Sequence, residues 1–244
     1  MPMRSGRISV VVPCFNEEKT IYRNLKNIFD YLKNRFPEFE LIAVNDGSAD
    51  RTFEKLNKFQ RDFAIRIINN NPNEGKGKAV RQGILKSRFE TVMFLDADLG
   101  IPVEELERFL EEMDKGFDLV IASRFVPGLK VLRPVAWHRR FMEKVFRILR
   151  IMIIDMGNVK DTQCGFKVFR REAAMKIFPR LQVKRFAFDA DVVYLANKFG
   201  CKIKELPISL QNPPEIHIRL IRDPLNMALD LLRIKVNDWK GKYD

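Results

Sequence analysis

The stretch VMFLDADLG, residues 92–100, joins a run of apolar residues to two aspartates. The apolar run is typical of a buried strand, so Asp96 and Asp98 are expected at the carboxyl end of that strand, with only Ala97 between them. Alternate residues of an extended chain point to the same side. The stretch therefore predicts a strand that presents a pair of carboxylates at one edge of a sheet.

The first half of the chain alternates apolar runs with amphipathic segments. Strands are expected at 8–15, 39–45, 65–70, 91–96 and 118–123, and helices at about 18–35, 50–63, 77–88 and 103–115. This alternation predicts an α/β fold in which helices cover both faces of a mostly parallel sheet. Ligands of such sheets bind beyond the carboxyl ends of the strands, where polar loops follow four of the expected strands.

The second half departs from this alternation. A basic amphipathic helix is expected within 133–157, followed by a strand at 165–169, helices at about 171–178 and 189–200, a strand at 202–210 and a last basic helix at about 223–238. No low-complexity linker divides the 244 residues, so one domain over 1–244 is expected.

The composition points to an anionic partner. Lys and Arg number 44 against 32 Asp and Glu, which gives a net charge of +12 and suits a nucleic acid, a phospholipid surface or a phosphorylated substrate. Basic residues are interleaved with acidic ones and no nucleic-acid-binding motif occurs, which disfavours a nucleic-acid-binding protein. Three scattered cysteines indicate a reducing, cytoplasmic setting. No signal peptide or membrane-spanning run is recognised, so any membrane contact is expected to be peripheral.

The polar loops favour an oxygen-ligated metal beside a phosphate. With only two histidines, His138 and His217, a nitrogen-ligated site is disfavoured. Asp96 and Asp98 suit Mg²⁺ or Mn²⁺, although a solvated turn or a helix cap would explain them too.

Two further loops suit a nucleotide. Gly75 and Gly77 flank Lys76 in a candidate phosphate cradle. Asp46 could accept a hydrogen bond from a base or ribose, or could simply shape the turn at Gly47.

Five segments together resemble the ordered motifs of inverting family 2 glycosyltransferases with the GT-A fold, a Rossmann-like, mostly parallel mixed sheet flanked by helices. They are VVPCFNEE (11–18), VNDGSADRT (44–52), NEGKGKAVRQG (73–83), LDADLG (95–100) and ASRF (122–125). Within that family, DTQCGFKVFRREAA (161–174) and RFAFDADVVYLA (185–196) are especially similar to dolichyl-phosphate β-glucosyltransferases and their polyprenyl-phosphate relatives.

The resemblance implies which parts of the chain bind the donor and which bind the acceptor. Residues about 1–125 would bind the nucleotide sugar, and about 126–244 would bind the acceptor. Asp96 and Asp98 would face the ribose, the metal and the diphosphate, with Asp98 as the direct ligand. Gly100 stands where related mannose synthases often have a metal-ligating glutamine. The nucleoside would be surrounded by Pro13, Asn16, Glu17 and Asp46, with Lys76 nearby.

The implied reaction moves a hexose, with glucose favoured, from a nucleotide-diphosphate sugar to dolichyl or polyprenyl phosphate. The donor would be UDP-glucose, or alternatively GDP-mannose, and the lipid phosphate would displace the nucleotide directly with inversion. Arg124 is expected to bind the acceptor phosphate, with Arg133 and Arg139 behind it. Asp189 is expected to contact the sugar, and helix capping would also explain it. Gln163 and Asp191 complete the expected sugar site.

What receives the sugar, and whether the chain is catalytic at all, stay open at this point. The basic helices would lie on the cytoplasmic face of a membrane, alone or with a separate membrane protein, if the acceptor is a lipid. A transferase of the same fold with a soluble or polysaccharide acceptor would instead be active without lipid. A non-catalytic relative is disfavoured by the intact Asp96, Asp98 and Arg124.

Overall fold

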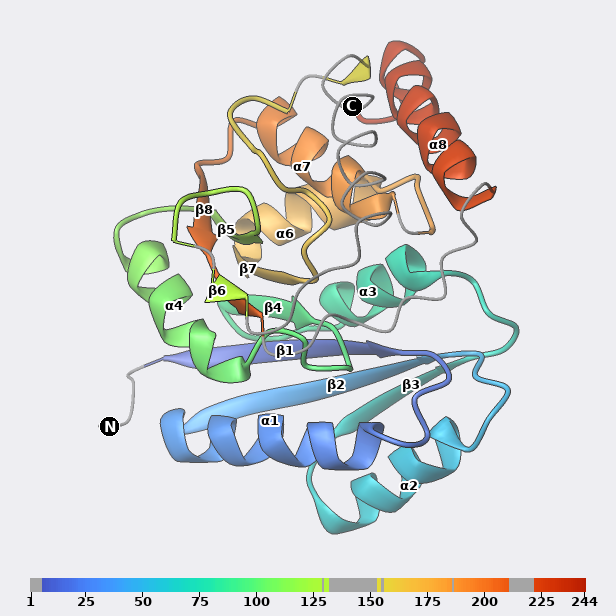
Figure 1. Ribbon diagram of the computed structural model, residues 1–244, viewed down its shortest axis with the longest axis vertical. Coiled ribbons are helices and arrows are strands. Elements are labelled where there is room, and N and C mark those ends of the chain that lie inside the picture. The colour runs from blue at the N-terminus through green and yellow to red at the C-terminus, as the bar shows by residue number, and fades with distance from the viewer. Residues whose placement is uncertain (1–5, 129, 132–152, 155, 186, 211–221) are drawn as a thin grey trace.

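A seven-stranded sheet runs through the centre of the molecule (Figure 1). The structure is a computed structural model and describes residues 6–128, 130–131, 153–154, 156–185, 187–210 and 222–244. The strands of the sheet are β1 (Arg7–Cys14), β2 (Glu38–Asp46), β3 (Arg66–Asn70), β4 (Thr91–Leu95), β5 (Leu119–Ser123), β7 (Phe166–Arg170) and β8 (Ile203–Pro207). Two short strands, β6 (Lys130–Val131) and β9 (Ser209–Leu210), pair separately.

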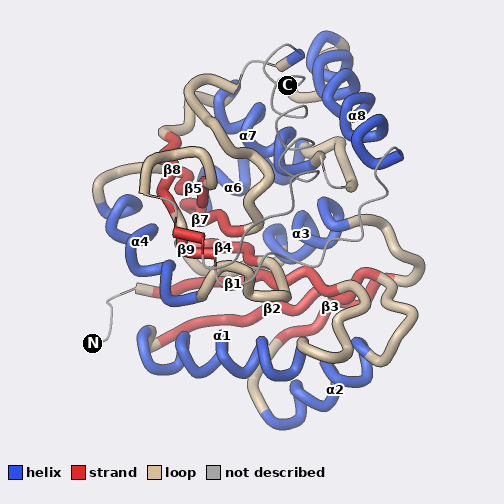
Figure 2. The backbone as a smooth tube through the Cα atoms, in the orientation of Figure 1, coloured by secondary structure: helices blue, strands red, loops and turns tan. Residues whose placement is uncertain are grey.

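Helices cover both faces of this sheet (Figure 2). Their bounds are α1 (Ile21–Arg35), α2 (Thr52–Asp62), α3 (Lys76–Leu85), α4 (Leu106–Asp114), α6 (Arg171–Ile177), α7 (Phe188–Lys198) and α8 (Arg222–Trp239), with 3-10 turns η1 (Val103–Glu105) and η2 (Phe178–Arg180). The expected strands and helices are confirmed to within a few residues at their ends. The expected helix within 133–157 falls largely outside the described residues.

The strand order is β3-β2-β1-β4-β7-β5-β8. Neighbouring strands are parallel except at β7, which lies antiparallel between β4 and β5. The carboxyl ends of β1 to β5 therefore meet the amino-terminal end of β7 at one edge of the sheet. Loops from both halves of the chain converge there, and this edge holds the site described below.

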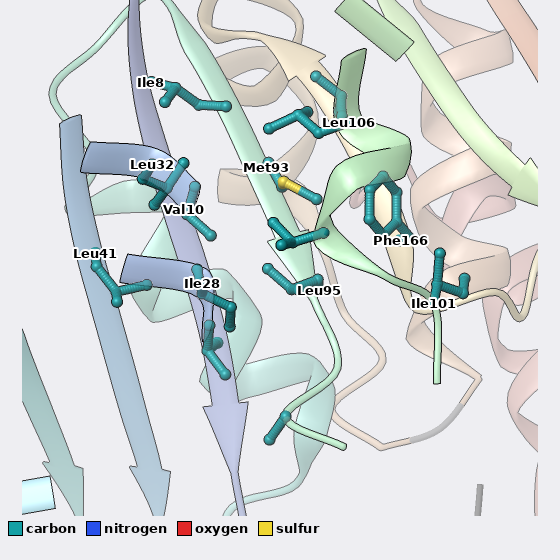
Figure 3. Close-up of a cluster of buried hydrophobic side chains, with 14 of the residues drawn as sticks. Ile8, Val10, Ile28, Leu32, Leu41, Met93, Leu95, Ile101, Leu106 and Phe166 are labelled. Carbon is teal, nitrogen blue, oxygen red and sulfur yellow. The ribbon is translucent and has the colours of Figure 1, made fainter. Parts of the chain in front are cut away.

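Two apolar layers hold the sheet between its helices. Residues of α1, α2 and α4 pack on one face, where Ile28 and Leu32 of α1 meet Val10 of β1 and Met93 of β4 (Figure 3). Residues of α3, α6, α7 and α8 form the layer on the other face. Central strands buried on both faces explain why their sequences read as continuous apolar runs.

Close packing of α3 fixes the position of its first turn. A Cβ atom at Gly83 would lie 2.3 Å from Cγ1 of Val11, so only glycine lets the helix approach β1 this closely. The amino terminus of α3, with Lys76 as its first residue, is thereby held over the functional edge of the sheet.

In the described parts of the chain, no helix combines the length and apolar character that crossing a bilayer requires.

Candidate functional site

The acidic pair lies at the end of β4, where the sequence predicts it. The Asp96 amide donates a hydrogen bond to the carbonyl of Gly165 (3.0 Å), which ties the loop to the start of β7. The Gly100 amide donates to Oδ1 of Asp98 (2.9 Å). Burial, followed by the negative charge of Asp96, raises the pKa of Asp98. Such mutual repulsion in a partly desolvated place is relieved when a cation binds between the carboxylates.

Gly165 makes room for the Asp96 carboxylate. A Cβ atom at position 165 would lie 2.0 Å from Oδ2 of Asp96, well inside van der Waals contact. Gly165 of the DTQCGF motif thus leaves space for Asp96, which lies in a different loop. The linear sequence does not reveal this contact.

Replacing this glycine tests the arrangement. Gly165→Ala is expected to push the Asp96 carboxylate away and to lower glycosyl transfer at least tenfold, because misplacing a ligand group by about 1 Å can cost a hundredfold in rate. The measurement is the initial rate at saturating Mn²⁺. Gly116→Ala is the control for backbone strain: Gly116 has φ of +94°, which disfavours alanine, but a Cβ atom there meets nothing within 4 Å and displaces no carboxylate. Equal rates for Gly165→Ala and the wild type would contradict the role assigned to Gly165.

Lys76 brings a positive charge to the acidic pair. Its Nζ lies 2.5 Å from Oδ1 of Asp96, and the two side chains are 24% and 36% exposed. Burial favours the neutral amine, but Asp96 and then Asp189 outweigh burial and raise the pKa of Lys76. Gly75, with φ of +100°, lies so close to the backbone of Lys184 that a Cβ atom there would be 2.5 Å from the Lys184 carbonyl oxygen. The ammonium is therefore charged and lies against the acidic pair.

Asp46 is buried and organises the loop that carries Lys76. Its Oδ1 accepts hydrogen bonds from the Glu74 amide (3.0 Å) and from Asn70 Nδ2 (3.2 Å). Its Oδ2 accepts from the Gly75 amide (2.8 Å) and from Asn73 Nδ2 (2.9 Å). Four protein donors thus surround the carboxylate. These contacts show that Asp46 holds residues 73–75, the loop that leads into Lys76 and is called the cradle loop below. Direct contact of Asp46 with a nucleoside remains a prediction.

The loop after β1 is fastened to the loop after β2 by reciprocal hydrogen bonds. The Asn16 amide donates to Oγ of Ser48 (3.0 Å), and Oδ1 of Asn16 accepts from the Ala49 amide (2.9 Å). The Glu17 amide donates to Oγ1 of Thr52 (2.7 Å). Burial, and then the charge of Asp98 among nearby carboxylates, raises the pKa of Glu17. Glu17 therefore lies within electrostatic reach of the acidic pair, while Pro13 is buried within β1.

Arg124 is held by a buried carboxylate that the sequence did not single out. Asp161 accepts from the Arg124 amide (3.0 Å) and Nε (2.7 Å) through Oδ2, and from Nη2 (3.0 Å) through Oδ1. The Arg124 side chain is 18% exposed and that of Asp161 is 1% exposed. This two-pronged pair fixes the plane of the guanidinium. Arg133 and Arg139, the other expected acceptor residues, lie outside the described residues.

The Arg124–Asp161 pair makes stability depend on pH. Burial favours the neutral acid, but Arg124 outweighs burial and lowers the pKa of Asp161 below its ordinary value. The pair therefore contributes stability above the unfolded pKa of about 3.9, and this contribution is lost as pH falls through the lower folded-state pKa. We expect the free energy of unfolding to fall more steeply below about pH 4 in the wild type than in Asp161→Asn. Parallel profiles from urea denaturation would contradict this.

Asp189 lies at the start of α7 and pairs with a fully buried lysine. Lys167, in the middle of β7, donates from Nζ to Oδ1 of Asp189 and to the carbonyl of Cys164 (2.7 Å). Its Nζ also lies 5.1 Å from the centre of the Phe94 ring. Burial raises the pKa of Asp189, against the opposing effect of Lys167 and Lys76. Lys167 is not among the residues predicted from the sequence, although a lysine inside the apolar strand GFKVF is a usable signal.

The structure separates Asp191 from Asp189. Residues two apart on a helix face different directions. Oδ2 of Asp191 accepts from the amides of Gln182 (2.9 Å) and Val183 (3.0 Å), and Oδ1 accepts from the Tyr243 hydroxyl (2.7 Å). Asp191 thus ties residues 182–183 and Tyr243 to α7, and its expected place beside the sugar stays a prediction. Gln163 lies beside the Arg124 anchor, with its amide donating to Oδ1 of Asp161 (3.0 Å).

The acidic pair has the chemistry of a divalent cation site. Oδ1 of Asp96 is buried, and beyond its ion pair with Nζ of Lys76 (2.5 Å) it has no hydrogen-bond partner among the described residues. Hard carboxylate oxygens suit Mg²⁺ and Mn²⁺. No cluster of three or more His, Cys, Asp or Glu side chains that could hold a metal occurs in the described ranges. The residues fit a divalent cation, which Asp96 and Asp98 would hold.

Solved structures confirm the GT-A fold. Glucosyl-3-phosphoglycerate synthase from Mycobacterium tuberculosis, in complex with UDP, matches with a TM-score of 0.65 at 18% identity over 94% of this chain and 81% of the other. The same enzyme with Mn²⁺, UDP and phosphoglyceric acid matches with a TM-score of 0.63 at 18% identity over 96% of this chain and 78% of the other.

Sequence relatives identify the family. Residues 9–178 match the model of Glycosyl transferase family 2. A dolichyl-phosphate beta-glucosyltransferase of Trichomonas vaginalis is 35% identical over 93% of this chain and 70% of its own length. The enzymes of that name from Saccharomyces cerevisiae and Homo sapiens are 32% and 31% identical, each over 97% of this chain and over 76% and 77% of their own lengths. This chain therefore belongs to glycosyl transferase family 2 and is a glycosyltransferase.

Proposed function

We propose that this protein transfers glucose from UDP-glucose to the phosphate of dolichol or a related polyprenol, with inversion at the sugar. The observation that carries the proposal is that enzymes named for this activity align with nearly the whole chain, the DTQCGF and FDAD segments included. The site supports it by gathering carboxylates, a lysine and a fixed arginine at one edge of the sheet.

The nucleotide end of the donor is proposed to lie against the loops after β1, β2 and β3. Asn16, Glu17 and Pro13 would line the nucleoside, while Asp46 would act mainly by holding the cradle loop. Lys76 would meet the diphosphate. Asp96 and Asp98 would hold Mg²⁺ or Mn²⁺, and the bound cation would neutralise charge on the departing diphosphate.

The acceptor end is proposed to lie between the Arg124 loop and α7. The guanidinium that Asp161 orients would bind the lipid phosphate and aim one oxygen at the anomeric carbon, with Arg133 and Arg139 assisting. A phosphate monoester is already ionised near neutral pH, because its second pKa is about 6, so no protein group has to remove a proton. Asp189, fixed by Lys167, would contact a sugar hydroxyl, with Gln163 nearby.

A lipid acceptor places the reaction at a membrane surface. The protein would then work as a peripheral enzyme on the cytoplasmic face, and its net charge of +12 would favour an anionic leaflet. A separate membrane protein could share this task.

Donor choice tests the proposal. Purified protein with Mn²⁺ and dolichyl phosphate is supplied with UDP-glucose or with GDP-mannose, and release of the nucleoside diphosphate is followed. We expect UDP-glucose to be used at least tenfold faster, and EDTA to stop release. Preference for GDP-mannose would overturn the choice of donor, and full activity in EDTA would overturn the cation.

A further inference from the structure

The outward side of α8 carries a stripe of exposed apolar side chains. Leu229, Leu232, Val236 and Trp239 are 45%, 48%, 44% and 87% exposed. At about 100° per residue, these positions fall within roughly 80° of one another around the helix. We refer to these four residues as the α8 stripe. Isolated exposed leucines are ordinary, but four aligned on one helix face indicate a surface that another apolar phase covers.

The opposite side of α8 is fixed to the body of the protein. Leu231 and Ile234 are fully buried in the layer that includes α7. Figure 1 shows α8 lying along the outside of the molecule beside α7. Because Leu231 and Ile234 already place the inner face of α8 in the core, the α8 stripe on its outer face is not needed for packing within the protein.

Several hydrogen bonds and ion pairs lock the end of α8 onto α7. The hydroxyl of Tyr194 donates to Asp238 (2.6 Å), and Lys198 pairs with Asp238 (2.5 Å) and Asp244 (2.9 Å). The buried Tyr243 donates to Asp191, two residues beyond Asp189. Whatever the α8 stripe binds is therefore held in a fixed orientation to the helix that carries a site residue.

Basic side chains border the α8 stripe. By the same helical geometry Arg233 lies on one side of it and Lys235 on the other. Lys240 and Lys242 follow directly after the helix, and all four basic residues are exposed. Asp230, which pairs with Arg233, and Asp238, which pairs with Lys198, have side chains only 12% and 28% exposed. From residue 229 onward, these four exposed basic residues outnumber the one exposed acid, Asp244, whose carboxylate pairs with Lys198, so the border of the stripe is predominantly positive.

We propose that the α8 stripe docks on the surface of an anionic phospholipid bilayer. Apolar side chains would enter the headgroup region, Trp239 would lie at the interface, and the basic border would meet lipid phosphates. A second copy of the chain is a poorer occupant, because Arg233 and Lys235 would then face like charges across the paired stripes. This inference rests on the proposed function, in which the acceptor phosphate lies at that surface.

Vesicle binding tests the surface without any enzyme reaction. The full chain is sedimented with vesicles of phosphatidylcholine and phosphatidylglycerol, or of phosphatidylcholine alone, both lacking polyprenyl phosphate. We expect binding to the anionic vesicles, and at least a tenfold loss of it in Leu232→Ser/Val236→Ser. Leu85→Ser, at a leucine 37% exposed outside the stripe, serves as the control and is expected to bind as the wild type does.

Tryptophan fluorescence tests membrane contact of the α8 stripe without relying on the variant Leu232→Ser/Val236→Ser. The chain has two tryptophans, so Trp137→Phe leaves Trp239 as the reporter. We expect its emission to shift to the blue when anionic vesicles are added. Unchanged emission, no binding by the wild type, or equal binding by Leu232→Ser/Val236→Ser would overturn the proposal. Conversion of a wild-type dimer to a monomer by the double variant would assign the α8 stripe to a second copy and overturn it as well.

A different experiment tests the proposed function independently of membrane docking. With a short-chain, water-soluble polyprenyl phosphate as acceptor, the wild type and the double variant are expected to transfer glucose at equal rates. If both are inactive with every polyprenyl phosphate while the vesicle results hold, the proposed function is wrong and the docking surface stands. If only the double variant is inactive with the soluble acceptor, α8 serves the site itself and the docking proposal is overturned.

Discussion

Asp98→Ala is expected to lower glycosyl transfer by about a thousandfold or more, since losing a cation that neutralises developing charge costs several kcal/mol of transition-state stabilisation. Asp98 is partly buried, lies beside Asp96 and is oriented by the Gly100 amide. Removing its carboxylate would leave Asp96 as the one carboxylate of the pair. The measurement is the initial rate of UDP release with UDP-glucose, dolichyl phosphate and saturating Mn²⁺.

The control for this variant is Asp114→Ala, at the exposed end of α4. It is expected to keep the wild-type rate. The strengthening of UDP binding by Mn²⁺, followed by calorimetry, should also disappear in Asp98→Ala and persist in the control. Normal turnover of Asp98→Ala at saturating Mn²⁺ would show that the acidic pair does not hold the cation.

Lys167→Met is expected to destabilise the fold by about 3–5 kcal/mol, because it leaves a buried carboxylate without its partner. The Lys167 side chain is fully buried and that of Asp189 is 3% exposed. Methionine fills most of the space of the lysine stem, so the loss reports the missing charge rather than a cavity. The measurement is the free energy of unfolding from urea denaturation at neutral pH.

A second substitution separates stability from activity. In Lys167→Met/Asp189→Asn the buried charge is removed along with its partner, so most of the lost stability is expected to return. Transfer of glucose should stay low, because Asp189 is the proposed sugar contact. Wild-type stability of Lys167→Met would contradict the importance of the pair, and wild-type activity of the double variant would contradict the role of Asp189.

The strands and helices were predictable because their patterns are local. The apolar run ending at Asp96 marks β4, and the amphipathic segments mark the helices that cover the sheet. The antiparallel insertion of β7 between β4 and β5 was not predictable from pattern, since an apolar run has no direction. The position of β7 brings Gly165 against the Asp96 carboxylate and buries Lys167.

The site was predictable in outline and less so in the role of each side chain. Asp96, Asp98 and Lys76 lie together as the motifs indicate. Asp46 and Asp191 are engaged by backbone amides from neighbouring segments, contacts that depend on tertiary structure alone. Asp161, the partner of Arg124, lay within a quoted motif but had no signal separating it from its neighbours.

The most direct test of the account is the phase in which transferred glucose appears. Protein, Mn²⁺ and radiolabelled UDP-glucose are incubated with dolichyl phosphate, and label is counted after extraction with organic solvent. If the acceptor is dolichyl phosphate, the organic phase will contain label that depends on the lipid, is released by mild acid and is absent when EDTA is present. Label confined to the aqueous phase, whether or not dolichyl phosphate is present, would contradict a lipid acceptor while leaving the family and the fold in place.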